Sequence, residues 1–481
     1  MSYKNSQQFV AALESAGELH RVSVEVDPML EIAAIADRTS KAHGSALLFE
    51  NVKGSPFPLL INAFGSYRRM HMALDCNSFD EIGSRLQSRI KMQPPESLID
   101  KIRMLFTLKE MADMLPKKVK RAPCQDRAFD SNSALLDMLP ILTCWPHDGG
   151  PFVTLPLVIT KDPDNGIQNV GMYRMQKYDK ATTGMHWQYN KDGARHFDKY
   201  KARGERMPVA VALGGSPVVT YAATAPLPPD VDELVLAGFI NGRAIEVVKA
   251  ETVDLFVPAE SDFILEGYVD PHEERIEGPF GDHTGFYSPA DAYPVFHVTR
   301  ITCRNNAVYP ATVVGKPPME DCYMAKATER IFLPLITFLV PEIVDIELPM
   351  EGVFHNCALV TIDKKFPGQA KKVIHALWGI GQMSSTKYVA VFDRDIDLRD
   401  SRTVVWKLLN NVDPKRDLVL SEGPLDALDH SAPYPDFGGK MGIDATRKTR
   451  EEGMGREWPE EIRMSTDVEE LVSGRWKEYG L

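Results

Sequence analysis

The feature that most constrains the fold is a change of pattern along the chain. Residues 135–304 carry short apolar runs of β type, each interrupted by proline or glycine. The clearest runs are Pro156–Ile159, Val209–Ala212, Pro217–Thr220, Ala244–Val248 and Phe296–Thr299. Many short strands with frequent turn signals predict a barrel or a sandwich. A helix is expected within this region over residues 230–240.

The segment before this β-rich region predicts a mixture of helices and strands. Helices are expected over Ser6–Ala16, where apolar residues recur at helical spacing, and from Pro28 onward. Leu47–Phe49 and Leu59–Ile61 are typical of short buried strands. Charged sequence of helical type then runs from Pro95 to Lys118. The first part of the chain is therefore expected to be an α+β unit that ends in a helical linker.

Beyond residue 316, apolar strands and helices alternate, which is typical of an α/β sheet. Strands are expected at Cys357–Ile362 and Tyr388–Phe392, and helices over Gly368–Trp378 and Val404–Leu409. The final helix, predicted over Thr466–Glu478, carries apolar side chains that nothing nearby in the sequence covers. A partner subunit is one source of that cover.

A chain of 481 residues is too long for one core of ordinary size, so several packed units are expected. The pattern divides it into an N-terminal α+β domain with its linker at 1–118, a β-rich domain at 119–315, an α/β domain at 316–465 and a C-terminal helix at 466–481. The net charge of −12 disfavours nucleic acid as a partner, because binding phosphates requires a basic face. The basic run Lys117–Arg121 is interpreted as a solvated hinge.

The cysteines and the chain ends indicate a cytoplasmic protein. None of the six cysteines forms a CxxC pair, so neither a zinc ribbon nor a thioredoxin-type site is expected. The N-terminal residues lack the apolar segment of a secretory signal, and no run is long enough to span a membrane. Peripheral contact with the inner membrane stays open as an alternative.

Two polar stretches are the strongest indication of chemistry. Asn169–Arg174 contains a guanidinium, and Glu277–Asp282 contains two carboxylates separated by turn-forming residues. The turn allows both acids to point at one place, where their repulsion would raise one pKa while an arginine keeps the other acid ionised. This pattern is typical of an acid/base site. Spacing alone leaves a solvated acidic turn as the alternative.

The chain resembles the UbiD family of non-oxidative aromatic decarboxylases, which depend on prenylated FMN. The resemblance extends over nearly the whole length and rests on motifs in the same order. These motifs are Phe49–Val52, Ala122–Gln125, Thr143–Pro146, Asn169–Arg174, Pro226–Pro229 leading to Asp232 and Glu233, Leu265–Tyr268, Glu277–Gly285 and Lys440–Thr446. Within the family, the chain is most similar to the bacterial 4-hydroxy-3-polyprenylbenzoate decarboxylases of ubiquinone biosynthesis.

The resemblance implies a fold that agrees with the pattern above. It implies an N-terminal α+β domain, a central split β-barrel that binds the flavin, and a C-terminal α/β domain whose last helix reaches a neighbouring subunit. Homo-oligomers from dimers to hexamers are usual in the family. A flavin prenyltransferase would supply the cofactor.

The family motifs also assign residues. Asn169 and Glu233 match the metal ligands, which hold Mn²⁺ or another divalent ion, with K⁺ as a further candidate ion. Their oxygens are hard ligands that suit such ions. The cofactor-lining segments match Met172, Tyr173, Arg174, His186, Trp187, Gln188, Lys191 and Asp192. For His186 and Trp187, ordinary packing inside the barrel is the alternative.

One position departs from the family pattern. Many relatives carry a histidine as third metal ligand where this chain has Asn190. An asparagine oxygen still coordinates, but it is a weaker ligand for manganese than imidazole. Metal choice and cofactor occupancy are therefore open at this position.

The implied activity is the reversible decarboxylation of a hydroxylated aromatic acid through a covalent adduct with prenylated FMN. Arg174 would pair with Glu277 and steer the substrate carboxylate, and Asp282, with a pKa raised by burial and by Glu277, would donate the proton that replaces CO₂. Similarity favours 4-hydroxy-3-polyprenylbenzoate as substrate. The alternatives are a naphthoate of menaquinone synthesis, vanillate or protocatechuate, a non-catalytic paralogue in a multi-subunit carboxylase, and a metal-dependent hydrolase.

Overall fold

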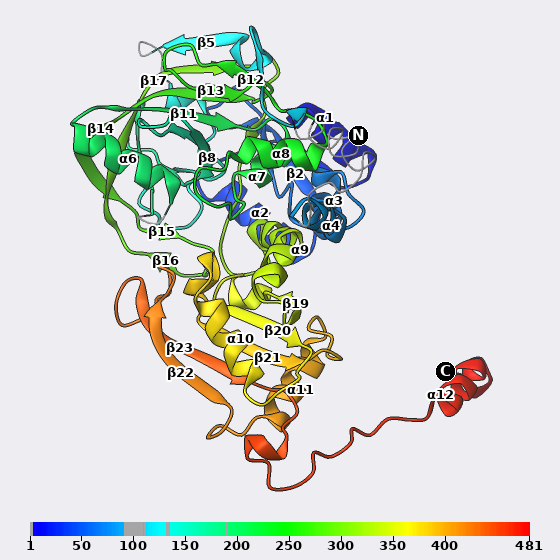
Figure 1. Ribbon diagram of the computed structural model, residues 1–481. Helices are drawn as coiled ribbons and strands as arrows, with labels where there is room; N and C mark the ends of the chain where they lie inside the picture. Colours follow the sequence, from blue (N-terminus) through cyan, green and yellow to red (C-terminus); the bar gives the residue numbers. More distant parts are fainter. Residues whose placement is uncertain (1–2, 91–108, 110–111, 131–134, 189–190) are drawn as a thin grey trace, which may run out of the picture.

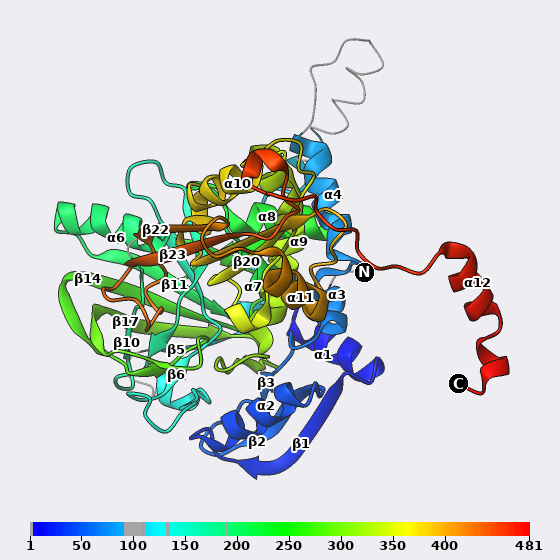
Figure 2. The ribbon, with the colours of Figure 1, turned by 90° about the horizontal axis from the view of Figure 1, so that it is seen from below.

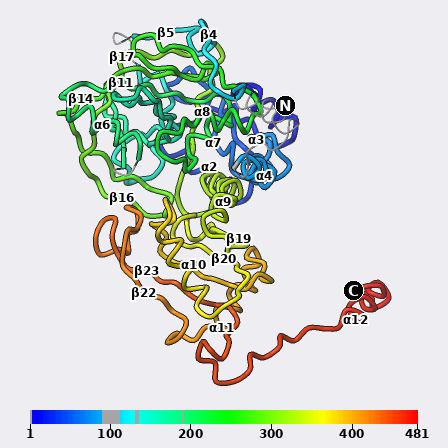
Figure 3. The backbone as a smooth tube through the Cα atoms, in the orientation of Figure 1, coloured from blue at the N-terminus to red at the C-terminus, as the bar shows by residue number. Residues whose placement is uncertain are grey.

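The computed structural model describes residues 3–90, 109, 112–130, 135–188 and 191–481. The N-terminal and central parts of the chain form one large body, and a smaller sheet unit lies below it (Figure 1). An extended segment leads from this unit to a C-terminal helix that stands away from the rest (Figures 2 and 3). Most of the helix expected over Pro95–Lys118 falls outside the described residues. Its end, at Lys117–Val119, is strand β4.

The N-terminal part combines helices with a small sheet, as predicted. Its elements are α1 (Ser6–Ser15), β1 (Leu19–Val26), α2 (Glu31–Lys41), β2 (Ala46–Val52), β3 (Leu59–Ile61), α3 (Tyr67–Leu74) and α4 (Phe79–Ile90). The helix expected near Ser6 and the two short strands are confirmed. A fourth strand, β18 (Tyr309–Pro310), pairs in parallel with β3, so the end of the central region completes the N-terminal sheet.

The central part is built on a seven-stranded sheet whose neighbouring strands are all antiparallel. Its strands are β5 (Arg127–Asp130), β7 (Leu157–Lys161), β8 (Gln168–Met172), β10 (Thr182–Gly184), β11 (Met207–Leu213), β14 (Phe263–Glu277) and β17 (Asp291–Cys303). The order is β10-β17-β14-β11-β7-β8, with β5 beside β17. Among the described residues, β8 and β10 do not pair, so the sheet does not close into a barrel.

Smaller strands and three helices complete the central part. The strands are β6 (Phe152–Val153) with β9 (Met175–Gln176), β12 (Glu246–Lys249) between β4 and β13 (Phe256–Pro258), and the hairpin of β15 (Phe280–Gly281) and β16 (Tyr287–Ser288). Helix α8 (Glu233–Asn241) confirms the helix expected near residue 235. Helix α6 (Asp192–Arg203) had no counterpart among the predictions.

One predicted strand is wrong. Pro217–Thr220 begins helix α7 (Pro217–Ala222), although its residues are rich in β-branched side chains. Proline fits the first position of a helix because its missing N–H has no partner to lose there. The preceding Gly214 and Gly215 both have positive φ, which turns the chain into the helix, and burial of every α7 side chain then outweighs β propensity.

The C-terminal unit is an α/β sheet, as predicted. Its elements are α9 (Glu320–Leu339), β19 (Ile343–Glu347), β20 (Cys357–Ile362), α10 (Gln369–Trp378), β21 (Tyr388–Asp393), α11 (Ser401–Asn411), β22 (Leu418–Pro424), β23 (Phe437–Asp444) and the separate helix α12 (Thr466–Gly474). The strand order is β19-β20-β21-β23-β22, with parallel pairs at the centre. Apolar residues of α10 and α11 pack against opposite faces of this sheet.

The core is divided unequally between these parts. Two large apolar clusters each combine N-terminal residues, such as Leu13 or Ile32, with central residues, such as Leu157 or Phe263. The C-terminal sheet has clusters of its own. The first two parts therefore share both large clusters. Helix α9 adds Ala327 and Ile331 to the first of them, whereas the rest of the C-terminal sheet unit has its own core.

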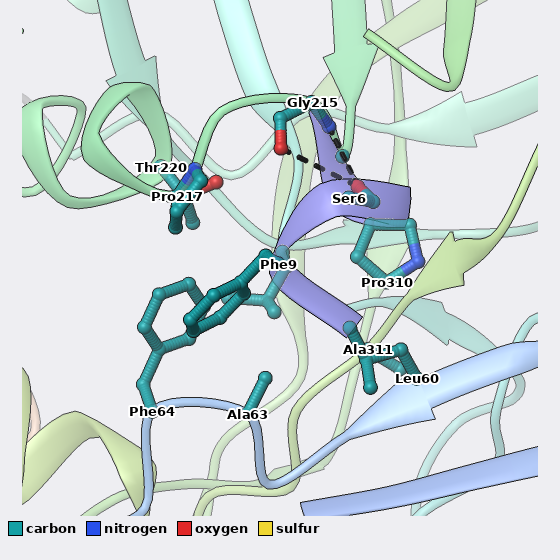
Figure 4. A pocket seen from close by; sticks show the side chains of 12 residues that line it. Ser6, Phe9, Leu60, Ala63, Phe64, Gly215, Pro217, Thr220, Pro310 and Ala311 are labelled. Atoms are coloured by element: carbon teal, nitrogen blue, oxygen red, sulfur yellow. Dashed lines mark hydrogen bonds between the residues drawn. The ribbon is translucent and has the colours of Figure 1, made fainter. Parts of the chain in front are cut away.

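A small cavity lies where α1, β3 and α7 meet (Figure 4). Its volume of about 30 Å³ suits about one water molecule. Phe9, Leu60 and Phe64 line it with apolar surface, and Ser6 accepts a 2.9 Å hydrogen bond from the backbone N–H of Gly215 at its edge. It contains none of the residues predicted to bind cofactor or substrate.

Candidate active site

The central sheet brings the two polar stretches together. Arg174 follows β8, and Glu277 ends the long strand β14, just before the β15–β16 hairpin. The Arg174 Nε donates to Glu277 Oε1 at 3.0 Å, and its Nη1 donates to Asp282 Oδ2. The guanidinium therefore lies between the two predicted carboxylates.

Further contacts hold this guanidinium in place. The Arg174 Nη2 donates to Ser288 Oγ at 3.1 Å, and the guanidinium carbon is 4.7 Å from the centre of the Phe280 ring. Glu277 is 1% exposed and Asp282 is 6% exposed. The alternative of a solvated acidic turn is therefore wrong, because both carboxylates are buried. Ser288 was not predicted as a site residue. It reaches the guanidinium because it pairs with Phe280 across the β15–β16 hairpin, and no local sequence signal indicates this.

The expected rise in the pKa of Asp282 is also wrong. Burial acts to raise it, but the hydrogen bond from His283 and the charges of His283 and Arg174 outweigh burial and hold the pKa of Asp282 well below its usual range. The prediction assumed that two neighbouring acids repel each other. Asp282 instead bonds to His283, the larger cause, and to Arg174, so the interactions that decide this pKa are attractive.

His283 and His355 join the site, and neither was assigned a role from the sequence. The His283 Nδ1 lies 2.9 Å from Asp282 Oδ1, and its Nε2 lies 2.9 Å from the Nε2 of His355. His283 stands directly after Asp282 in the quoted motif, which was a usable signal. His355 comes from the C-terminal sheet unit, and nothing in its local sequence indicates that it reaches the central domain.

His186 has a polar role rather than a packing role. Its Nδ1 lies 2.8 Å from Glu277 Oε1, and its ring is 4.3 Å from that of Tyr293. The other carboxylate oxygen of Glu277 is buried without a hydrogen-bond partner. Glu277 is therefore held by Arg174 and His186 on one oxygen, and its second oxygen is free to bind a donor from a substrate or cofactor.

The predicted metal ligands Asn169 and Glu233 are in direct contact. Asn169 Nδ2 donates to Glu233 Oε1 at 2.7 Å and lies 3.5 Å from Asp192 Oδ2. The backbone N–H of Val170 donates to the other Glu233 oxygen at 2.7 Å. Three elements thus meet here, because Asn169 lies in β8, Asp192 begins α6 and Glu233 begins α8.

This cluster fits a cation. Asn169 Oδ1 is buried and has no hydrogen-bond partner, and burial raises the pKa of Glu233 to about 8 because no positively charged side chain among those described compensates it. Rotating the Asn169 amide by half a turn would direct its oxygen to the two carboxylates, since the N and O assignments of an amide follow its surroundings. The result is a set of oxygen donors suited to Mn²⁺ or Mg²⁺.

The described residues contain no group of three or more histidine, cysteine, aspartate or glutamate side chains placed to hold a metal ion. A cation bound by Asn169 and Glu233 would therefore need further oxygen ligands, which a phosphate can supply. Asn190, the position that departs from the family pattern, lies outside the described residues.

The other predicted cofactor residues take different places. Tyr173 and Trp187 are buried in an apolar cluster shared by the first two parts, and the Trp187 ring is 5.3 Å from Phe197. The indole Nε1 of Trp187 is buried without a hydrogen-bond partner. Met172 packs at the edge of the neighbouring cluster. Burial lowers the pKa of Lys191, despite the opposing charges of Asp426 and Asp192, and Gln188 is half-buried beside it.

The loop that carries Asp282 is fixed from outside by Trp145. The indole Nε1 of Trp145 donates to the carbonyl of Val314 at 3.0 Å. A Cβ atom at Gly281 would lie 2.1 Å from the indole, and one at Gly315 would lie 2.8 Å from it. Both positions therefore require glycine, and the ring fixes the backbone next to Asp282.

Among the residues that the structure describes, no helix combines the length and the apolar character needed to cross a membrane. Three family models match most of the chain. They are the N-terminal domain of 3-octaprenyl-4-hydroxybenzoate carboxy-lyase over residues 10–86, its Rift-related domain over 117–317 and its C-terminal domain over 322–445.

Relatives match along the full length. An uncharacterized protein of Archaeoglobus fulgidus is 52% identical over 480 residues, which cover 99% of each chain. The vanillic acid decarboxylase of Sedimentibacter hydroxybenzoicus, in its closed form, is 28% identical with a TM-score of 0.85, covering 100% of this chain and 99% of the other. The UbiD-class enzyme HmfF of Pelotomaculum thermopropionicum, in complex with FMN, is 29% identical with a TM-score of 0.81, covering 97% and 99%.

Proposed function

The chain belongs to the UbiD family of carboxy-lyases, and on this premise we propose that it releases CO₂ from a hydroxylated aromatic acid with prenylated FMN as cofactor. The observation that supports this activity best is Arg174, with only 11% of its side chain exposed, held between the buried Glu277 and Asp282. A guanidinium has five N–H donors, and three of them account for the contacts with Glu277, Asp282 and Ser288. The others remain for a substrate carboxylate.

Each residue of this cluster has a separate task in the proposed reaction. Arg174 orients the carboxylate of the substrate, and burial strengthens this ion pair by excluding water. Glu277 fixes the guanidinium through Nε, and His186 fixes Glu277. Asp282 delivers the proton that takes the place of CO₂. Because the pKa of Asp282 is low, this residue is ionised at rest and must receive a proton before it can pass one on.

The proposed cofactor site follows from the cation cluster. Asn169 and Glu233 would hold a divalent cation, Mn²⁺ in the first instance, against the cofactor phosphate, with Lys191 and Asp192 beside it. The flavin would lie along Met172, Arg174, His186 and Gln188. When bound, prenylated FMN supplies an electron-accepting ring system for the electron pair released as the carboxyl group departs.

The substrate class proposed is a phenolic carboxylic acid. A polyprenylated 4-hydroxybenzoate is the acid suggested by sequence motifs. Vanillate is suggested by the structural likeness to the vanillic acid decarboxylase. Pocket width decides between the two, because a polyprenyl chain requires a long apolar channel. Protocatechuate and a menaquinone-type naphthoate complete the set to be tested.

We further propose the boundaries 1–118, 119–315, 316–465 and 466–481 for the N-terminal domain, a split barrel, the α/β domain and an oligomerisation helix. Helix α12 supports the last of these. Leu471 in α12 is 55% exposed, and Trp476, in the 3₁₀ turn that follows α12, is 50% exposed. A helix of this length is marginal in water without tertiary packing. A second copy of the chain would cover them, in a dimer or a larger homo-oligomer. Light scattering of the full chain, compared with Leu471→Asp, tests the proposal: the variant should have the lower mass.

The experiment that tests the function is expression together with a flavin prenyltransferase, followed by the visible spectrum and intact mass of the bound cofactor. Prenylated FMN with stoichiometric manganese is expected. CO₂ release is then measured with each of the four acids. A protein that binds the cofactor but releases CO₂ from none of them would contradict the substrate class, and one that cannot be loaded would favour a non-catalytic role.

A further inference from the structure

The chain of side chains that begins at Asp282 continues into the C-terminal sheet unit. His283 lies in the loop of the β15–β16 hairpin, and His355 lies just before β20. Their Nε2 atoms are 2.9 Å apart, and the two rings meet edge to face at 83°. Two imidazole nitrogens at this distance share one hydrogen, so one ring donates and the other accepts.

The segment that presents His355 is held in an unusual conformation. Val353 and Phe354 have φ values of 44° and 54°, in the left-handed region that residues other than glycine rarely adopt. Phe354 stacks on His283 with ring centres 5.1 Å apart. Positive φ at two neighbouring non-glycine residues costs free energy that the surrounding structure must supply, and such positions gather at functional sites.

The charges around the two histidines differ. Asp282 on the hairpin, Asp321 at the start of α9 and Asp426 after β22 face His283, and together with the hydrogen bond that His283 donates to Asp282 they outweigh burial and raise the pKa of His283. Asp426 and Asp429 face His355, but burial and the neighbouring His283 prevail and lower its pKa to about 4. His283 is thus the protonated ring, and His355 is neutral and accepts its Nε2–H.

We propose that His355 is a positioning residue for the decarboxylation: it holds His283 in the doubly protonated state whose Nδ1–H is directed at Asp282. This inference deepens the proposed function and rests on it. His355 and Phe354 belong to the C-terminal sheet unit, so their contacts with His283 form only when that unit packs against the central domain.

The proton balance is simple. The electron pair of the broken bond between the ring carbon and the carboxyl group ends in a new C–H bond. The Nδ1–H bond of His283 first breaks as an O–H bond forms on Asp282, and this O–H bond then breaks as Asp282 passes the proton to that carbon. Asp282 ends as carboxylate once more and His283 ends neutral. After product release, His283 takes the next proton from solvent.

The test compares three variants of the loaded enzyme. His355→Leu removes the acceptor, and kcat should fall about tenfold to a hundredfold, the loss expected for a hydrogen bond to a charged group, with KM nearly unchanged. The alkaline limb of the pH–kcat profile should move to lower pH by about one unit, because the imidazolium loses a partner that favours it. His355→Gln, which offers an amide oxygen, should restore most of the kcat and most of the position of the alkaline limb.

His430→Leu is the matched control. His430 comes from the same C-terminal unit, and its ring contacts Phe286 of the same hairpin with ring centres 3.8 Å apart. Among the described residues, His283 Nε2 bonds to His355 and not to His430. This variant should leave the alkaline limb in place. If His355→Leu and His430→Leu give the same limb as the wild type, the role of His355 is only structural and the proposal is overturned.

A second measurement separates this inference from the function itself. In cofactor-free protein labelled with ¹⁵N-histidine, the His283 ring should titrate at lower pH in His355→Leu than in the wild type, and His283→Gln assigns its signal. An unchanged titration overturns the inference. Failure of the wild type to release CO₂ from any acid would instead count against the proposed function, and the titration would still decide whether His355 holds the proton on His283.

Discussion

The candidate site contains two carboxylate clusters that differ in what balances their charge. Around Arg174, one guanidinium bonds to both Glu277 and Asp282. Around Asn169, the carboxylates of Asp192 and Glu233 approach the same amide, and Glu233 has no cationic partner among the described side chains. The pKa values follow this difference, since that of Asp282 is depressed and that of Glu233 rises to about 8.

The difference shows how to distinguish a finished site from one that awaits a ligand. A buried carboxylate that the chain neutralises itself is ready to act on a substrate. A buried carboxylate that the chain leaves unbalanced, beside an amide oxygen without a partner, marks a place for a cation from outside. Five substitutions test this contrast, beginning with the largest expected effect.

Asp282→Asn should reduce turnover by about 10²- to 10⁴-fold, because the amide cannot pass a proton on. The Asn169 cluster is unchanged in this variant, so cofactor and metal contents should equal those of the wild type. Steady-state CO₂ release and the visible spectrum measure the two effects. Near-normal turnover would show that Asp282 is not the proton donor, and the Arg174 cluster would then have only a binding role, like the Asn169 cluster.

Arg174→Met should destabilise the cation-free protein far more than Glu233→Gln. The first removes the guanidinium shared by two buried carboxylates, which keep only their histidine partners, and should cost about 3–5 kcal/mol in the free energy of unfolding. The second keeps an oxygen for the backbone N–H of Val170 and should change stability by less than about 1 kcal/mol. Denaturant unfolding without metal measures both. Equal losses would show that the clusters do not differ in charge balance.

Added Mn²⁺ should affect the stability of the wild type and of Glu233→Gln differently. Binding to the folded state stabilises it in proportion to the logarithm of the cation concentration, so the wild type should gain stability and Glu233→Gln should gain little. Asp192→Asn serves as the nearby control, with a partial loss. A full gain in Glu233→Gln would show that the cation binds elsewhere.

The pH dependence of stability should report the Asp282–His283 pair. The lowered pKa of Asp282 contributes stability that is present above its unfolded value of 3.8 and is lost as pH falls through the folded value. The raised pKa of His283 contributes stability that is present below its unfolded value of 6.5 and is lost as pH rises through the folded value. The pair therefore stabilises most between those two pH values. Melting temperatures of the wild type should exceed those of Asp282→Asn most within that window, and a constant difference would contradict the pairing.

Ser288→Ala should have the smallest effect. It removes one of the three contacts of the Arg174 guanidinium and leaves both ion pairs in place. The expected loss is about 0.5–1.5 kcal/mol, or less than about tenfold in kcat/KM. A loss as large as that of Asp282→Asn would mean that Ser288 takes part in the chemistry itself.

Three elements show which parts of the fold could be predicted from sequence. Cys357–Ile362 was predicted with the bounds it has, because a short apolar run between turn residues matches a buried strand. Pro217–Thr220 was predicted as a strand and is helical, because the turn at Gly214 and Gly215 and complete burial outweigh β-branched composition. Helix α9 was missed because it continues through Pro334, which normally ends a helix.

The site divides in the same way. Motifs placed Arg174, Glu277 and Asp282 in one cluster, since residues in quoted turns and strand ends carry local signals. The sign of the pKa shift at Asp282 depends on which cationic groups contact it, first His283 and then Arg174, and spacing does not encode that. His355 could not be found from sequence, because its contact joins two separately cored units whose relative placement depends on tertiary packing.

The indole of Trp145 has a consequence for the evolution of this chain. Because it occupies the space in which side chains at Gly281 and Gly315 would stand, a mutation at either glycine is accessible only after residue 145 has become smaller. A smaller residue there leaves a void beside the Asp282 loop, so each single step passes through a less fit intermediate. Lineages with this enzyme should therefore change these three positions together or not at all. Reconstructed ancestors in which only one of the three is altered should be the rarest.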